Sequence, residues 1–482
     1  MVTDGLKPRE VFRYFEEICS IPHGSSDTKR ISDYCVDFAK RHNLKYIQDE
    51  SNNVIVFKPA TKGYEGRSTV MIQGHLDMVC EKEEDCTIDF ANDGLTLMVS
   101  GDLISAKGTT LGGDDGIAVA YGLALLASDD INHPPLEVVF TVDEEIGMLG
   151  AAELDCTPLK SRYILNLDSE EEGVLLVSCA GGVTVTCSLP VEKEKKAGIR
   201  VRLSVEGLTG GHSGVEIDKG RGNACQILGR ILYSINRSVD FNIIDVSGGL
   251  KDNAIPRSAT VDLMICEEQK NQLSDLVTEL EYTLKNEYRN SDEDLCLRLE
   301  WQDNATCDVM SYLTGRRLIT ALYGLPGGVQ KMSKDIEGLV QTSLNMGILK
   351  ASDEEINISF SVRSSVDSEK KELVDRLECL MNMIGGSVSV CGDYPAWEYK
   401  KDSVLRELMK EIYTEQTGKE PVIQAIHAGV ECGIFTGKMN EPDAVSFGPD
   451  IYDIHTPKER MSISSVERTW KYLIEILKRI DE

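Results

Sequence analysis

Residues 69–77 read Thr-Val-Met-Ile-Gln-Gly-His-Leu-Asp, and this stretch decides the fold class. The apolar run 69–73 ends at Gly74, as expected of a strand that is buried on both faces of a parallel sheet. His75 and Asp77 follow directly, and open α/β sheets place their ligand sites at the carboxyl ends of such strands. The stretch therefore predicts a buried central strand with a functional site at its end.

Strand and helix signals alternate on both sides of this stretch. Strand character is found at 54–57, 136–142 and 163–167, and helical spacing at 10–19, 28–41 and 115–126. This alternation predicts a mainly parallel α/β sheet flanked by helices. The pattern returns after residue 395, with strands at 422–426 and 444–447 and a closing helix at 464–479.

Between residues 187 and 395 the order of elements changes. Two sets of strands and helices follow one another in the same order, the first over 199–297 and the second over 313–390. This predicts an α+β lid domain of two similar subdomains. We therefore expect a catalytic domain formed by residues 1–186 and 396–482, interrupted by a lid domain at 187–395.

The composition of the chain limits the kinds of molecule that we expect it to bind. A length of 482 residues favours more than one domain, and 51 basic against 80 acidic residues give a formal charge of −29. This charge argues against nucleic acid and anionic membranes as partners. The N-terminus lacks a signal-peptide pattern, and no apolar segment reaches the roughly 18 residues of a membrane helix. Fourteen scattered cysteines without a Cys-x-x-Cys pair are typical of reduced, buried thiols, so a cytoplasmic protein is expected.

Acidic and histidine side chains gather in five short segments. They lie at 74–77, 111–116, 142–147 and 165–170, each at a predicted strand end or helix start, and in the loop 448–457. Each segment alone has an ordinary explanation, because a His-x-Asp is usually a hydrogen-bonded loop and acidic residues stabilise helix N-termini. Together the five segments predict a metal site.

The residue types in these segments suit hydrolysis. Histidine and carboxylate without cysteine are a ligand set of hydrolytic zinc. Two divalent metals about 3.5–4 Å apart share a bridging carboxylate and leave room for water. Asp77 can accept the second ring N–H of His75. Of the adjacent Glu144 and Glu145, one can bind metal while the other stays free as a general base.

With these motifs the sequence resembles the di-zinc exopeptidase family that includes glutamate carboxypeptidase, peptidase T and the aminoacyl-histidine dipeptidases. Within the family the resemblance is strongest to the aminoacyl-histidine dipeptidases. It covers essentially the whole chain, including the insert and the His-Ala-Gly-Val-Glu-Cys-Gly segment at 427–433. The family usually has alanine before the bridging aspartate, where this chain has Gly113, a change that the pattern tolerates.

The resemblance implies a role for each residue of the predicted metal site. It places His75 and Asp168 on one zinc, Glu145 and His455 on the other, and Asp114 as the bridge, with Asp115 as the competing choice for the bridge. It also implies Glu144 as the general base and Asp77 as the residue that orients His75.

The resemblance further implies substrate contacts from the insert. His212 in the Gly-Gly-His-Ser-Gly turn would contact the oxyanion or the substrate carbonyl, although the turn alone suggests only a tight loop. Asn253 would hydrogen-bond the peptide, and His427 would line the specificity pocket. Arg363 would bind the C-terminal carboxylate of the substrate, because a guanidinium binds a carboxylate bidentately, with a surface ion pair as the alternative.

We therefore expect a metallo-dipeptidase that carries two Zn²⁺ or other divalent ions and hydrolyses Xaa-His dipeptides. The alternatives are an N-acyl amino acid amidohydrolase of the same family and an inactive metal-binding scaffold. The expected partners are a small peptide substrate and, at most, a second copy of the chain in a homodimer. His212 is expected to act within its own chain, because the lid has two subdomains.

Overall fold

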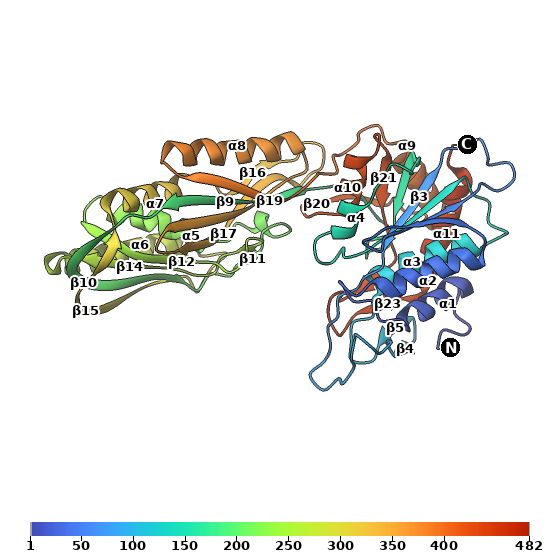
Figure 1. The fold of residues 1–482 in the computed structure, drawn as a ribbon, viewed down its shortest axis with the longest axis horizontal. Helices are drawn as coiled ribbons and strands as arrows, with labels where there is room; N and C mark the ends of the chain where they lie inside the picture. The colour runs from blue at the N-terminus through green and yellow to red at the C-terminus, as the bar shows by residue number, and fades with distance from the viewer. Residues whose placement is uncertain (1, 482) are drawn as a thin grey trace. The chain divides into compact units, whose positions relative to one another are not determined.

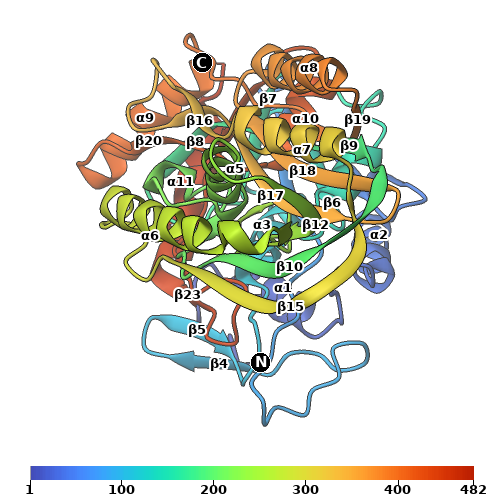
Figure 2. The same cartoon turned by 90° about the vertical axis from the view of Figure 1, so that its left-hand side faces the viewer.

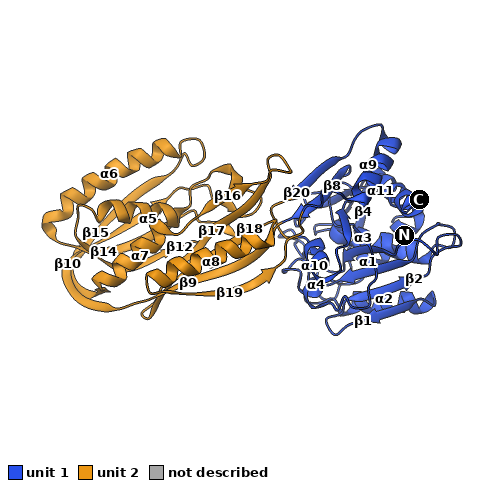
Figure 3. Cartoon of the chain, turned by 90° about the horizontal axis from the view of Figure 1, so that it is seen from above, with its two compact units in different colours: residues 1–179, 399–425, 430–482 blue, residues 180–398, 426–429 orange. Residues whose placement is uncertain are grey.

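The computed structural model describes residues 2–481 and divides the chain into two compact units (Figure 3). Unit 1 contains residues 1–179, 399–425 and 430–482, and unit 2 contains residues 180–398 and 426–429. The sequence suggested that 426–429 belongs with the outer pieces, but these residues pack with unit 2. Within that unit, Ala180 N donates a hydrogen bond to Ile426 O (3.1 Å).

Unit 1 is a mixed eight-stranded sheet with helices and a small four-stranded sheet (Figure 1). Its elements are α1 (Arg9–Cys19), α2 (Lys29–Arg41), β1 (Lys45–Gln48), β2 (Val54–Lys58), β3 (Val70–His75), β4 (Leu97–Ser100), β5 (Leu103–Ala106), α3 (Gly113–Ala127), β6 (Leu136–Thr141), α4 (Leu149–Glu153), β7 (Tyr163–Asn166), β8 (Val174–Cys179), α9 (Val404–Thr417), β20 (Val422–Ile426), α10 (Glu431–Lys438), β21 (Asp443–Ser446), β22 (Ile451–Tyr452), β23 (Arg460–Ser462) and α11 (Ile463–Arg479).

The centre of the large sheet is parallel. The sheet order is β1-β2-β6-β3-β7-β21-β8-β20, and the pairs β6/β3, β3/β7 and β7/β21 are parallel. The pairs β1/β2, β2/β6 and β21/β8 are antiparallel, so the predicted parallel character holds at the centre and not toward the edges. Every residue of β3 is buried, as the uninterrupted apolar run indicated.

Helix α3 packs directly on β3. An added Cβ at Gly74 would lie 2.5 Å from the Cβ of Ala118 and 2.6 Å from Oδ2 of Asp115, so only glycine fits there. Nearly all of α3 is buried, which is typical of a helix in the middle of a core. The start of α3 is thereby fixed beside the carboxyl end of β3.

Unit 2 is built on one nine-stranded sheet (Figures 1 and 2). Its elements are β9 (Gly181–Pro190), β10 (Lys193–Glu206), β11 (Gly211–His212), η1 (Ile217–Lys219), α5 (Ala224–Ile235), β12 (Phe241–Gly248), β13 (Ala254–Ile255), β14 (Ala259–Ile265), η2 (Glu267–Gln269), α6 (Lys270–Glu287), β15 (Cys296–Met310), α7 (Tyr312–Gly324), β16 (Gly328–Met332), β17 (Val340–Ala351), β18 (Glu355–Ser364), α8 (Asp367–Met383) and β19 (Ser387–Tyr394).

The sheet of unit 2 consists of two halves with the same arrangement. One half has the chain order β10-α5-β12-β14-α6-β15 and the sheet order β15-β10-β14-β12. The other has the chain order β9-α7-β17-β18-α8-β19 and the sheet order β17-β18-β9-β19. The halves meet at equivalent strands, where Ser247 and Gly248 of β12 pair with Lys350 and Leu349 of β17.

The two halves are not consecutive in the chain as expected, because one is nested in the other. Strand β9 precedes the whole first half, yet it pairs with β18 and β19 of the second. The similarity of the two subdomains and the α/β class of the chain agree with the sequence analysis. No helix within residues 2–481 has both the length and the apolar character needed to cross a bilayer.

Candidate metal centre

The predicted ligands of unit 1 converge at one edge of the large sheet. His75 is the last residue of β3, Glu145 follows the end of β6, and Asp168 follows the end of β7. These three strands are parallel neighbours, so their carboxyl ends meet at the same edge. Asp114 opens α3, as the sequence indicated for the segment 111–116, and does not end a strand of this sheet. His455 arrives from the loop between β22 and β23.

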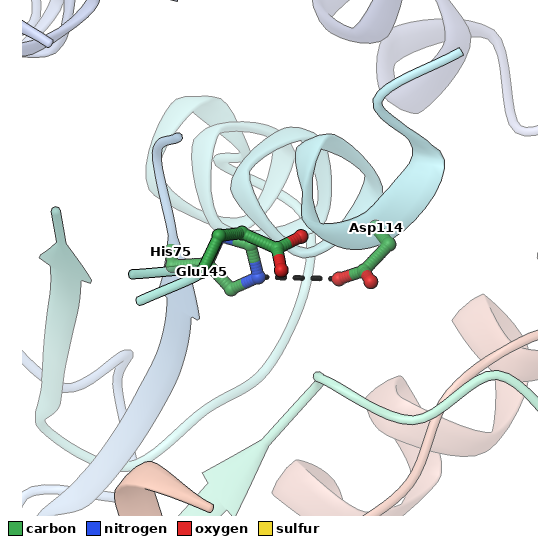
Figure 4. Close-up of side chains that lie close together, drawn as sticks. All are labelled: His75, Asp114 and Glu145. Atoms are coloured by element: carbon green, nitrogen blue, oxygen red, sulfur yellow. Dashed lines mark hydrogen bonds and ion pairs between the residues drawn. The ribbon is translucent and has the colours of Figure 1, made fainter. Parts of the chain in front are cut away.

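The carboxylate of Asp114 lies between two imidazoles. Its Oδ1 is 3.1 Å from Nε2 of His75, and its Oδ2 is 3.0 Å from Nε2 of His455. Figure 4 shows the contact of Asp114 with His75, beside the carboxylate of Glu145. One carboxylate with an oxygen toward each of two histidines has the geometry of a bridging ligand.

A second carboxylate accompanies each imidazole. Nε2 of His75 lies 3.7 Å from Oδ1 of Asp168, and Nε2 of His455 lies 2.9 Å from Oε1 of Glu145. His75 with Asp168 forms one group, and His455 with Glu145 forms the other. Each group thus offers one imidazole nitrogen, one carboxylate of its own and one oxygen of Asp114. This ligand chemistry fits a pair of divalent cations.

Asp115 occupies a different position. It also lies near His75 and Asp168, and the three could form a ligand group. However, Oδ2 of Asp115 accepts a hydrogen bond from the backbone N–H of His75 (3.1 Å). Burial raises its pKa well above the usual value. We favour Asp114 as the bridge because its two oxygens face both histidines.

The electrostatics of the centre favour bound positive charge. The hydrogen bonds with Asp114 and Glu145 raise the pKa of His455 to about 10. Burial alone would lower the pKa of His75, but the carboxylates of Asp114 and Asp77 raise it well above its usual value. In addition, Oε1 of Glu145 is buried and lies 2.9 Å from Nε2 of His455. The residues present therefore fit the metal pair that the sequence predicted.

Asp77 contacts the Glu144 segment as well as His75. Nδ1 of His75 lies 2.9 Å from the backbone oxygen of Asp77 and 3.5 Å from its Oδ1, so the carbonyl is the closer orienting group. The Asp77 carboxylate accepts hydrogen bonds from the backbone N–H of Glu144 (3.0 Å) and from Oγ of Ser25 (2.8 Å). Asp77 therefore links the His75 segment to the Glu144 segment.

Glu144 has the properties of a proton carrier. Burial, and then the neighbouring carboxylates of Glu431, Glu145 and Asp114, raise its pKa to about 8 against the opposing effect of His75. A carboxyl group with a pKa near neutrality can both accept and donate a proton during a reaction.

His212 belongs to unit 2 and presents a defined tautomer. Its Nδ1 accepts hydrogen bonds from the backbone N–H groups of Gly214 and Val215 (both 3.2 Å). Burial, and then the charge of Arg363, lower its pKa, which favours the neutral ring. Because Nδ1 is an acceptor, the proton of the neutral ring is on Nε2. That N–H is available to donate to an oxyanion.

The three other residues predicted to contact the substrate, which are Asn253, Arg363 and His427, also belong to unit 2. Asn253 is exposed, and its backbone oxygen accepts from Ser213 N (2.9 Å), next to the pairing of β11 with β13. Arg363 is buried on β18 and donates from Nη1 to the hydroxyl of Tyr394 (3.1 Å). Its Nε has no hydrogen-bond partner among the described residues. A buried guanidinium with an unused donor suits a carboxylate ligand.

His427 is a buried neutral imidazole. Its Nε2 lies 2.7 Å from Oγ of Ser343, while Nδ1 has no hydrogen-bond partner in the described part of unit 2. Burial, and then the positive charge of Arg363, lower its pKa to about 3. Arg363 therefore places one fixed positive charge near the neutral rings of His212 and His427.

The sequence analysis missed Glu431. This fully buried first residue of α10 accepts hydrogen bonds through Oε2 from Thr141 Oγ1 (2.7 Å) and from the Gln73 side chain. The Gln73 amide oxygen in turn accepts from Asn166, so one polar network joins β6, β3 and β7 just before the residues predicted as ligands. Glu431 lies in the segment 427–433. An acidic residue among apolar residues at a helix start was the sequence feature that could have identified it.

Comparison with known proteins places these features in context. Residues 71–479 match peptidase family M20/M25/M40. The chain is 39% identical over 479 residues to the cytosol non-specific dipeptidase of Escherichia coli (strain K12), with 98% of each chain covered.

Solved structures with the same fold were also found. The crystal structure of aminoacylhistidine dipeptidase from Vibrio alginolyticus superposes with a TM-score of 0.93 and 36% identity, over 100% of this chain and 98% of that one. Aminopeptidase PepT from Bacillus cereus ATCC 10987 shares the fold with a TM-score of 0.57 at 16% identity, over 99% and 100% of the two chains.

Proposed function

This chain belongs to peptidase family M20/M25/M40, and from that premise we propose that it is a two-metal dipeptidase with its metal centre at Asp114. As a member of the family it is a peptide-bond hydrolase. The observation that supports the metal centre most strongly is the Asp114 carboxylate between His75 and His455.

In the proposed centre, His75 and Asp168 hold one metal, Glu145 and His455 hold the other, and Asp114 bridges them. Bound divalent metals, for which we propose zinc, supply the Lewis acidity that activates water and polarises the scissile carbonyl.

The chain's own residues move the proton and bind the peptide. Glu144 takes the proton of the attacking water and delivers it to the leaving amine, a role supported by its pKa of about 8. Nε2–H of His212 donates to the developing oxyanion. Arg363 binds the C-terminal carboxylate, with Asn253 and His427 beside it. A carboxylate anchor one residue beyond the scissile bond selects dipeptides over longer chains.

We propose Xaa-His dipeptides among the substrates and a cytosolic location. The first rests on the aminoacylhistidine dipeptidase with the same fold, and the second on the cytosol dipeptidase relative.

The alternative activity is that of an N-acyl amino acid amidohydrolase. An N-acyl amino acid offers the same carboxylate as a dipeptide but no free amino group. Hydrolysis rates on a panel of dipeptides and matching N-acetyl amino acids, with and without chelator, test this proposal. We expect dipeptides to be cleaved only with metal bound, and preferential cleavage of the N-acetyl series would contradict it.

We also propose that His212 serves the metal centre of its own chain, including in any homodimer. Mixing His212→Ala with Glu144→Gln tests this. If the histidine acts within its own chain, the mixture stays as inactive as its parts. Activity restored on mixing would show that a partner subunit supplies the histidine.

A further inference from the structure

We propose that Glu459 is a positioning residue that fixes the Asp114 segment to the His455 segment and thereby sets the geometry of the metal pair. The inference rests on the proposed metal centre. Glu459 lies four residues after His455, just before β23, and its side chain is 3% exposed. Within the described residues Glu459 makes no hydrogen bond to the side chain of a proposed ligand, and it contacts the backbone of the Asp114 segment instead.

The carboxylate of Glu459 accepts from four consecutive backbone N–H groups. Oε2 accepts from Leu111 (2.8 Å) and Gly112 (3.2 Å). Oε1 accepts from Gly113 (2.8 Å) and Asp114 (3.4 Å). Converging N–H groups of this kind form an anion-binding concavity, and at a helix start they have no partners within the helix.

These hydrogen bonds join two segments that are more than 340 residues apart in the sequence. One segment carries the proposed bridge, Asp114, and the other carries His455. The distance of 3.0 Å between Oδ2 of Asp114 and Nε2 of His455 therefore depends on how the two backbones are held together. Hydrogen bonds to an ionised carboxylate are stronger than neutral ones, so a buried carboxylate is suited to hold them.

The two glycines before Asp114 make this arrangement possible. Gly112 has a φ of +66°, a left-handed conformation in which a side chain is strained. An added Cβ at Gly113 would lie 3.2 Å from Oε1 of Glu459, closer than most such contacts. Glycine at 113, where the family usually has alanine, thus lets the carboxylate approach the backbone closely.

Glu137 provides a matched control within the same unit. It is also buried and accepts from the backbone N–H groups of Lys160 (2.9 Å) and Ser161 (3.0 Å), as well as from the Ser161 hydroxyl. It lies near the start of β6, whereas the proposed ligands follow the end of that strand. Glu137 therefore has the same chemistry as Glu459 but holds no ligand segment.

The test compares the wild type with Glu459→Gln, Glu459→Asp and Glu137→Gln. Each protein is stripped of metal and titrated with Mn²⁺, and the two binding affinities and the Mn–Mn magnetic coupling are measured. Thermal unfolding of the metal-free proteins is recorded in parallel. We expect Glu459→Gln to weaken binding of one Mn²⁺ by about 10- to 100-fold and to reduce the magnetic coupling. In this variant an NH₂ group replaces one carboxylate oxygen, and it cannot accept the two backbone hydrogen bonds that this oxygen accepts in the wild type.

Glu137→Gln should lower the unfolding temperature but leave both affinities and the coupling unchanged. Glu459→Asp keeps the charge but shortens its reach, so we expect an intermediate loss of affinity, and this variant decides the matter if the amide variant does not fold. Wild-type affinities and coupling in the Glu459 variants, or an equal loss in Glu137→Gln, would overturn the inference. A wild type that binds one Mn²⁺ would instead refute the two-metal function, and the inference would fall with it.

Discussion

The histidines that the sequence assigned to the site have opposite electrostatic environments in the two units. In unit 1, carboxylates raise the pKa of His75 and His455. In unit 2, burial and Arg363 lower the pKa of His212 and His427. Imidazole groups thus serve in two different states. His75 and His455 lie where positive charge is stabilised, whereas His212 and His427 stay neutral. The difference fits the proposal that unit 1 holds the metal ions and that unit 2 supplies hydrogen bonds and one fixed guanidinium.

The largest effect that this comparison predicts concerns the carboxylate shared by the histidines of unit 1. Asp114→Ala should release metal and remove several kcal/mol of transition-state stabilisation, because a shared ligand holds both ions. Asp115→Ala should lose much less metal, since Asp115 accepts from the backbone of His75. Metal content by elemental analysis and kcat/KM check both. Equal losses would contradict Asp114 as the single bridge, and the reverse order would make Asp115 the bridge.

A smaller effect is expected at the guanidinium of unit 2. Arg363→Ala should lower kcat/KM on a free dipeptide by about 2–3 kcal/mol, the scale of a lost charge-assisted hydrogen bond. The loss should be much smaller on the same dipeptide with an amidated C-terminus, which has no carboxylate to bind. Tyr394→Phe, which removes the hydroxyl contacted by Arg363, is the control for a purely structural role. Equal losses on both substrates would place the carboxylate anchor elsewhere.

The last effect concerns the neutral state of His427 and changes stability instead of turnover. Its folded pKa of about 3 lies below its ordinary value of 6.5, so the unfolded chain binds a proton that the folded chain does not. This group therefore stabilises the fold fully above pH 6.5, and the contribution is lost as the pH falls toward 3. The free energy of unfolding of the wild type should fall relative to that of His427→Gln by about 1 kcal/mol per pH unit in this window. A difference that does not change with pH would show that His427 is protonated in the folded state.

The local features of the fold and the site could be predicted from the sequence. The buried strand at 69–73 and the predicted site residues after it depend on neighbouring residues, since an apolar run followed by His75 and Asp77 is a short-range pattern. The same holds for Glu144, Glu145 and Asp168 after their strands. The loop 448–457 with His455 was also visible in the sequence, and the family resemblance then implied its role and those of the residues of the lid.

The remaining features depend on contacts between distant segments. The nesting of one half of unit 2 in the other depends on the pairing of β9 with β18 and β19, which no local pattern encodes. Glu431 and Glu459 resemble ordinary acidic residues in the sequence. Their roles arise because tertiary packing buries them against Thr141 and against the backbone of residues 111–114.

The division of tasks within the Glu144-Glu145 pair tests the account most directly. We expect Glu144→Gln to retain both metals while turnover falls by about 10²- to 10⁴-fold, because this residue moves a proton and holds no ion. Glu145→Gln should lose one metal, because its Oε1 lies beside Nε2 of His455. The measurement is metal content and turnover on the same preparations of both variants. Loss of metal from Glu144→Gln with full metal content in Glu145→Gln would contradict the account.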